Sequence, residues 1–173
     1  RDPDYFALRL FAEMLGGGMS SRLFQAVREH RGLAYAIDAY ADTHADVGTL
    51  GIYAGAAAKD AGEAAEVAAA EFLALAEGLR EGELDRAKAQ LKGGTFMARE
   101  SALARAEQSA SQLLMFGRIL PPAEITAAID AVGPANIARL AGRLLEPRLC
   151  AGAVLGPKRA MAAAERFQRT LFG

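Results

Sequence analysis

The sequence predicts an α+β fold in which helices pack mainly on one face of an antiparallel sheet. Apolar residues recur at helical spacing over most of the chain, and only a few short stretches alternate with the period of two typical of strands. Few strands and many helices favour a sheet that helices cover on one side. The 173 residues fit a single domain that can bury its own core, so we expect one domain over 1–173.

A first helix is predicted at the N-terminus. Asp2 or Asp4 can cap it, and it continues to about Leu15. The glycines at 16–18 end it, because glycine is a poor helix former.

A second, shorter helix is predicted directly after these glycines. Ser20 or Ser21 can cap it, and it runs to about Glu29. Gly32 then closes it in the position that glycine favours beyond a helix end.

Two antiparallel strands are predicted next. Tyr35, Ile37 and Ala39 belong to an alternating series that ends near residue 41, and a second series covers 50–54. A turn near Thr43 to Asp46 joins them, which predicts an antiparallel pair.

The remainder of the chain is predicted to be mostly helical. Its longest helix should be interrupted or kinked at Gly93-Gly94. A last strand is predicted over 149–155, with Cys150 as a small core residue. The predicted helices cover 60–79, 83–116, 121–131, 133–145 and a segment that begins near 157.

The charge balance argues against nucleic acid or a membrane as partner. The 20 basic and 21 acidic residues leave a net charge of −1, which offers no attraction to polyanions. No apolar stretch is long enough to span a bilayer, and no signal peptide precedes Arg1. A chain that opens on Arg1 rather than Met suggests a piece of a longer protein, so its compartment stays unknown.

No metal centre and no catalytic residue are predicted on this chain alone. His30 and His44 are the only histidines, and neither belongs to H-x-x-E-H or H-E-x-x-H. Gly16, Gly17 and Gly18 open onto a helix N-terminus, where an anion can bind, yet neither a phosphate loop nor a dinucleotide fingerprint is present. A flexible flap beside a ligand is the favoured interpretation, and a stand-alone anion-binding module is the alternative.

Arg28 and Tyr35 are the remaining candidates for chemistry. They flank the Arg31-Gly32 turn, so both side chains can project from one edge of the domain and hold a peptide carbonyl or an oxyanion. The alternative is a surface arginine paired with Glu29 or Asp38 and a tyrosine packed on the sheet.

The segment from Leu15 to Ile37, LGGGMSSRLFQAVREHRGLAYAI, resembles a known family. It is similar to the C-terminal half-domain of the pitrilysin, insulin-degrading enzyme and mitochondrial processing peptidase family of zinc peptidases. The likeness continues through ELDRAK at 83–88, the Gly117-Arg118 helix end and Leu155-Gly156-Pro157. It therefore covers nearly the whole chain, from about Asp2 to Pro157.

This resemblance implies a half-domain of a clam shell. Two homologous α+β halves of the family face each other around a chamber, and the N-terminal half carries H-x-x-E-H and zinc. The C-terminal half has no zinc and closes the chamber over the peptide substrate. The family also places a first strand just before the region of Asp2, so we expect this chain to lack that strand.

The resemblance also assigns roles to the candidate residues. Tyr35 would polarise the scissile carbonyl or stabilise the oxyanion, Arg28 would orient the peptide, and Gly16, Gly17 and Gly18 would form a flexible wall beside it. The expected partners are an N-terminal catalytic half or a homologous subunit, with a homodimer as a further option. The alternative function is a pseudo-peptidase subunit that binds or supports a partner and cleaves nothing.

Overall fold

The computed structural model describes residues 2–44 and 46–173, and its sheet consists of two antiparallel strands. β1 covers Ala34–Thr43 and β2 covers Gly48–Ala56. The predicted antiparallel pair is therefore confirmed. Part of the predicted turn, at Ala45, lies outside the described residues.

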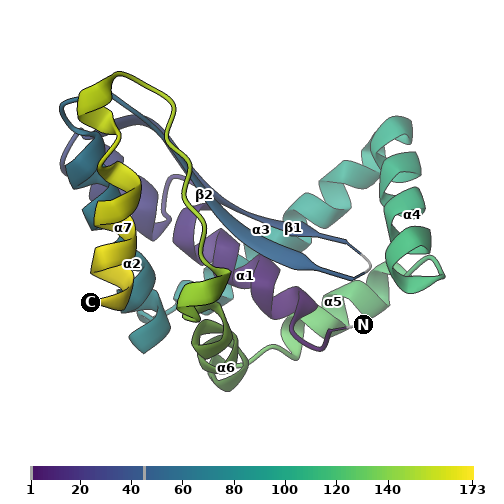
Figure 1. Cartoon of the computed structure of the whole chain (residues 1–173). Coiled ribbons are helices and arrows are strands. Elements are labelled where there is room, and N and C mark those ends of the chain that lie inside the picture. Colours follow the sequence, from purple (N-terminus) through teal and green to yellow (C-terminus); the bar gives the residue numbers. More distant parts are fainter. Residues whose placement is uncertain (1, 45) are drawn as a thin grey trace.

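Helices cover one face of this sheet, as predicted (Figure 1). α1, Tyr5–Gly16, packs against β1 and is buried along most of its length, with Leu10, Phe11 and Leu15 fully enclosed. α2, Ala61–Glu77, contributes Phe72 and Leu75 to the same core. The opposite face of the sheet carries exposed side chains, which confirms the α+β architecture with a one-sided cover.

The remaining helices contribute further residues to the core or pack against it. They are α3 at Glu83–Met97, α4 at Ala102–Phe116, α5 at Pro122–Asp130, α6 at Pro134–Leu144 and α7 at Ala163–Phe172. α7 packs along α2, whereas α4 projects away from the other helices (Figure 1).

The predicted interruption of the long helix at Gly93-Gly94 is wrong. Both glycines lie inside α3, and the helix breaks later, through a 3-10 turn at Ala98–Glu100. Ser101 has an extended backbone, and its side-chain oxygen accepts a hydrogen bond from the Ala104 N–H at the start of α4. Glycine lowers helix stability without forcing a break, while a cap that satisfies a free N–H fixes where a new helix begins.

The predicted strand at 149–155 is also wrong for this chain. After a 3-10 turn at Pro147–Leu149 the backbone follows no helix or strand up to residue 155, and Cys150 is half-buried rather than in the core. A strand needs a neighbour for its hydrogen bonds, and β1 and β2 pair only with each other among the described residues. The last helix correspondingly starts at Ala163, after a 3-10 turn at Lys158–Ala160, and not near Pro157.

The predicted serine cap is absent, whereas Asp2 Oδ1 accepts a hydrogen bond from the Asp4 N–H at 2.9 Å just before α1. Asp4 stands at the N-cap of α1, but its carboxylate pairs instead with Arg139 and Arg143 of α6. Ser21 precedes a helix whose main part, Phe24–Glu29, is a π-helix without a side-chain cap. Tertiary ion pairs therefore occupy the Asp4 carboxylate in place of the expected cap, and the buried Ser21 hydroxyl has no hydrogen-bond partner among the described residues.

No helix within the described part of the chain has the length and apolar character required to cross a bilayer.

Candidate functional site

The candidate site lies where the π-helix at Phe24–Glu29 leads into β1. The turn between them is closed by two backbone hydrogen bonds, from Gly32 N–H to the Arg28 carbonyl and from Leu33 N–H to the Val27 carbonyl, at 3.0 and 2.9 Å. Gly32 has a φ of +62°, a conformation that residues with a side chain rarely adopt. The predicted helix-closing role of this glycine is therefore confirmed. The turn therefore fixes the distance between the backbone positions of Arg28 and Tyr35.

Arg28 lies on the surface at the end of the π-helix. Its guanidinium stacks over the Phe24 ring at 4.8 Å, and its Nε lies 4.0 Å from a carboxylate oxygen of Glu29. The side chain stays 45% exposed, because neither contact encloses it. The π-helical turn brings Phe24 under the arginine, and such turns recur at functional sites.

A β-bulge turns Tyr35 outward. Ala34 pairs with Ala56 and Ala36 pairs with Gly55, so Tyr35 is one extra residue on β1. Simple alternation would put Tyr35 on the buried side with Ile37. The bulge instead leaves Tyr35 72% exposed, and its ring lies across Gly55 on the outer face of the sheet.

The outer face carries further polar and aromatic groups that the sequence analysis did not single out. Asp38 and Tyr40 of β1 and Tyr53 of β2 are exposed there, and Asp38 pairs with Tyr53 in the register. The period of two along β1 could have identified Asp38 and Tyr40. Nothing in the sequence marks the bulge that adds Tyr35 to the same face.

The glycine loop has a packing role that the sequence did not reveal. Gly16 is buried within α1, and a Cβ at this position would lie 2.2 Å from the Ala39 backbone nitrogen. Only glycine therefore permits this close approach of α1 to β1. Gly17 is exposed beside the Glu13 side chain, and Gly18 faces Gln90 of α3.

The structure thus places the five candidate residues in two separate settings. Arg28 and Tyr35 are exposed on either side of one turn, while the glycines lie at the C-terminal end of α1, where they face β1, α1 itself and α3 in turn. No hydrogen bond, ion pair or ring contact joins Arg28 to Tyr35 among the described residues. The binding role of all five stays a prediction.

Comparison with known proteins identifies the family. The family model of the peptidase M16 inactive domain matches residues 1–91, more than half of the chain. The chain belongs to this family.

Curated relatives of this peptidase M16 inactive domain are named zinc proteases. A protein from Rickettsia felis, called an uncharacterized zinc protease, is 34% identical over 152 residues, which are 88% of this chain and 37% of the relative. One of the same description from Streptomyces coelicolor is 35% identical over 90% of this chain and 34% of its own length. The chain therefore spans about a third of the length of the curated relatives it matches.

Solved structures have the same fold. A conserved protein from Enterococcus faecalis is 32% identical with a TM-score of 0.72, over 82% of this chain and 33% of that one. A peptidase M16 inactive domain from Pseudomonas fluorescens, at 23% identity, has a TM-score of 0.69 over 82% of this chain and 34% of that one. The predicted half-domain fold is confirmed by these neighbours.

The described residues of this inactive domain include no group of three or more His, Cys, Asp or Glu side chains placed to hold a metal ion. His44 lies 3.5 Å from Asp42 on the surface, without a third ligand beside them.

Proposed function

We propose that this domain is the non-catalytic C-terminal half of a zinc-dependent endopeptidase and that it closes the substrate chamber and binds the peptide. The outward position of Tyr35 is the observation that supports this proposal best. A bulge moves the tyrosine out of the buried series of β1, and bulges of this kind are often found beside functional sites, where they re-aim a side chain. A phenol exposed in this way can donate a hydrogen bond to a partner outside the domain.

In the proposed mechanism the zinc belongs to the N-terminal half, where it would supply an activated water for peptide hydrolysis. Tyr35 would donate a hydrogen bond from its hydroxyl group to the carbonyl oxygen as negative charge develops there. Arg28, held on Phe24, would orient the peptide through its guanidinium donors. The exposed Gly17 and the half-buried Gly18 of the loop would line the path of the peptide beside these two groups.

The domain would act together with more chain than these residues. The curated relatives are about three times as long as the matched region, which supports a partner half on the same chain or on a homologous subunit. The resemblance of the sequence to the family also supports a further strand before Asp2, which would pair with an edge of the two-stranded sheet. A homodimer would be one way to supply the homologous subunit.

The test is Tyr35→Phe in a protein that contains both halves. Loss of one oxyanion donor lowers kcat by about a hundredfold or more. Tyr53→Phe is the matched control, because Tyr53 is an exposed tyrosine of the same sheet face and should leave the kinetics unchanged. Arg28→Gln should raise KM more than it lowers kcat.

The possible results separate the two functions. Unchanged kcat for Tyr35→Phe would refute the catalytic role of the hydroxyl while leaving the peptidase assignment intact. A protein with both halves that cleaves no peptide and lacks an intact H-x-x-E-H would be a pseudo-peptidase subunit, which is the alternative function.

A further inference from the structure

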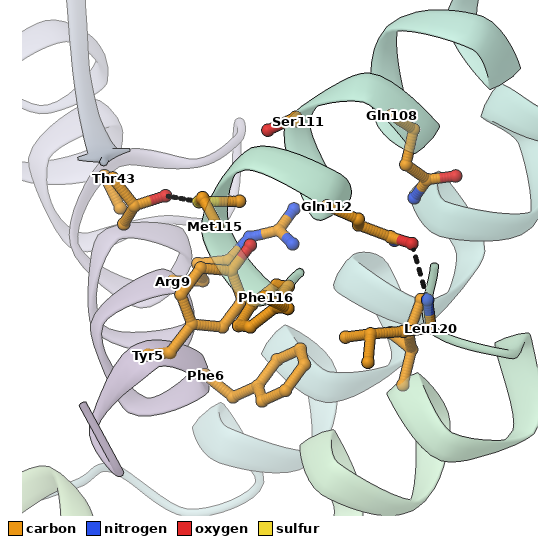
Figure 2. A pocket seen from close by; sticks show the side chains of 12 residues that line it. Tyr5, Phe6, Arg9, Thr43, Gln108, Ser111, Gln112, Met115, Phe116 and Leu120 are labelled. Atoms are coloured by element: carbon orange, nitrogen blue, oxygen red, sulfur yellow. Dashed lines mark hydrogen bonds between the residues drawn. The ribbon is translucent and has the colours of Figure 1, made fainter. Parts of the chain in front are cut away.

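A hollow lies away from the Arg28 turn, between α1, the end of β1 and α4. It is a cavity of about 260 Å³, open to solvent on one side (Figure 2). α1 contributes Tyr5, Phe6 and Arg9 to its wall, and α4 contributes Gln112 and Phe116. Residues about 100 positions apart in the sequence meet here, so no sequence motif could have marked this cavity.

Arg9 is the distinctive group of the cavity. It is half-buried, yet it forms no hydrogen bond or ion pair with any of the described residues. Its guanidinium carbon lies 5.9 Å from the centre of the Tyr5 ring, at the outer limit of a cation–π contact. Glu13, one turn further along α1, attracts it only from beyond ion-pair distance.

The other arginines among the described residues differ from Arg9 in either partners or exposure. Those that are enclosed have partners, as Arg22 does with Glu83. Those without a hydrogen bond or ion pair, such as Arg105 of α4, are exposed on the surface, where water can satisfy them. A partly desolvated guanidinium with all five N–H groups unpaired is therefore specific to Arg9 among the described residues.

The rest of the lining is suited to an anion attached to an apolar group. No aspartate or glutamate lines the cavity. The buried Gln112 uses its side-chain oxygen to accept a hydrogen bond from Leu120 N–H, which leaves its amide NH₂ as a donor. Arg9 and Gln112 line the same cavity, and Figure 2 shows the Gln112 amide directed toward Leu120, with the Phe6, Phe116 and Leu120 side chains below the Arg9 guanidinium.

We propose that this cavity binds an organic carboxylate that carries an apolar group, such as an aromatic ring, close to the carboxylate. The planar guanidinium matches a carboxylate with two parallel hydrogen bonds, and the aromatic floor takes the apolar group. Such a ligand is available as the C-terminus of a peptide that ends in an aromatic residue, or as a free aryl-alkyl acid. Both sources share the chemistry that the cavity recognises.

The test uses the whole 173-residue chain, labelled with ¹⁵N, in titrations followed by NMR. Three probes are compared: N-acetyl-Ala-Phe with a free carboxylate, the same dipeptide as its C-terminal amide, and 3-phenylpropionate. We expect saturable shifts at residues lining the cavity for the two carboxylates, and binding of the amide weaker by about tenfold or more, because a charge-assisted pair is lost. This comparison needs no mutation and so does not depend on the folding of a variant.

Arg9→Gln should weaken binding of both carboxylates by a similar factor, and Arg9→Lys, which keeps the charge without the fork, should weaken it less. Arg105→Gln is the matched control and should leave binding unchanged. Tighter binding of the peptide than of 3-phenylpropionate would identify a peptide C-terminus as the source, and equal binding would identify any aryl-alkyl acid. Equal binding of amide and acid, retention of affinity in Arg9→Gln, or no saturable shift at about 10 mM of either acid would overturn the proposal.

Discussion

Arg22 and Glu83 form an ion pair that the protein encloses almost completely. The arginine donates from Nε and Nη2 to the two carboxylate oxygens, each at 2.7 Å, and its side chain is 2% exposed. The same arginine donates to the Gly78 carbonyl at 2.8 Å, and the Arg80 backbone N–H donates to Glu83 at 2.9 Å. This network ties the start of the helix that leads to Arg28 to the start of α3, so it holds the candidate site on the core.

Removal of one partner of this pair should be far more costly than removal of both. Arg22→Met leaves a buried carboxylate without its cation and should lower the free energy of unfolding by about 3–5 kcal/mol, as measured in urea. The double variant Arg22→Met/Glu83→Leu should recover much of this loss. Arg148→Met is the control, because its exposed pair with Glu146 should contribute less than about 1 kcal/mol. A double variant as unstable as Arg22→Met would contradict this explanation.

The same pair predicts a pH dependence of stability. Burial raises the pKa of Glu83, but the hydrogen bonds from Arg22 and from Arg80 N–H outweigh it, so the pKa lies below its usual value of 4.5. A carboxyl whose pKa is lower in the folded state stabilises the fold above its unfolded pKa, and this stability is lost as the pH falls through the folded pKa. The stability difference between the natural chain and Glu83→Gln should therefore shrink between about pH 6 and pH 3. A difference that is constant over this range would contradict the role of the ionised carboxylate.

At the scale of elements, glycine has opposite effects on stability in α1 and α3. Gly16 allows α1 to lie against β1, where a Cβ would collide with the Ala39 backbone. Gly94 lies inside α3, and a Cβ there would meet nothing within 4 Å. The chain needs the first glycine for packing, whereas the second only weakens its helix.

Two alanine substitutions should therefore change stability in opposite directions. Gly94→Ala should raise the free energy of unfolding by about 1 kcal/mol, the difference in helix propensity. Gly16→Ala should lower it by about 1–3 kcal/mol or more, because the backbone must move to accept the methyl group. Urea unfolding of both variants tests this, and a stabilised Gly16→Ala would show that the contact between α1 and β1 is looser than described.

At the scale of the whole molecule, the chain matches about a third of the length of its curated relatives. Its sheet has two strands, α4 projects from the body, and its relatives are about three times as long as the matched region. The described residues hold no group that could bind a metal by three or more ligands. The proposed function accordingly assigns the zinc to another half of the protein.

The isolated chain should consequently bind no stoichiometric zinc and cleave no peptide. Elemental analysis after dialysis against zinc, together with fluorogenic peptide assays, measures both properties. Cleavage that depends on metal in the pure chain would contradict the assignment of zinc to the other half. A protein that joins the domain to an intact zinc half is the positive control.

Much of the site could be located from the sequence, because local chemistry determines it. The glycine at 32 ends a helix through its own backbone preference, and alternation after it marks β1. The positions of Arg28 and Tyr35 on either side of the turn follow directly from these two features. The bulge could not be predicted, since it depends on how Ala34 and Ala36 pair with β2.

The sequence by itself determined the family, the order of most helices, the pair of strands and the residues that flank the turn at Gly32. These follow from periodicity, end signals and the Leu15 to Ile37 segment, all of which act over short distances along the chain. Only the tertiary structure decided that Tyr35 faces outward, that Gly16 is a packing residue and that Arg9 lies unpaired beside α4. Each of these depends on contacts between segments far apart in the chain, whose packing no local pattern specifies.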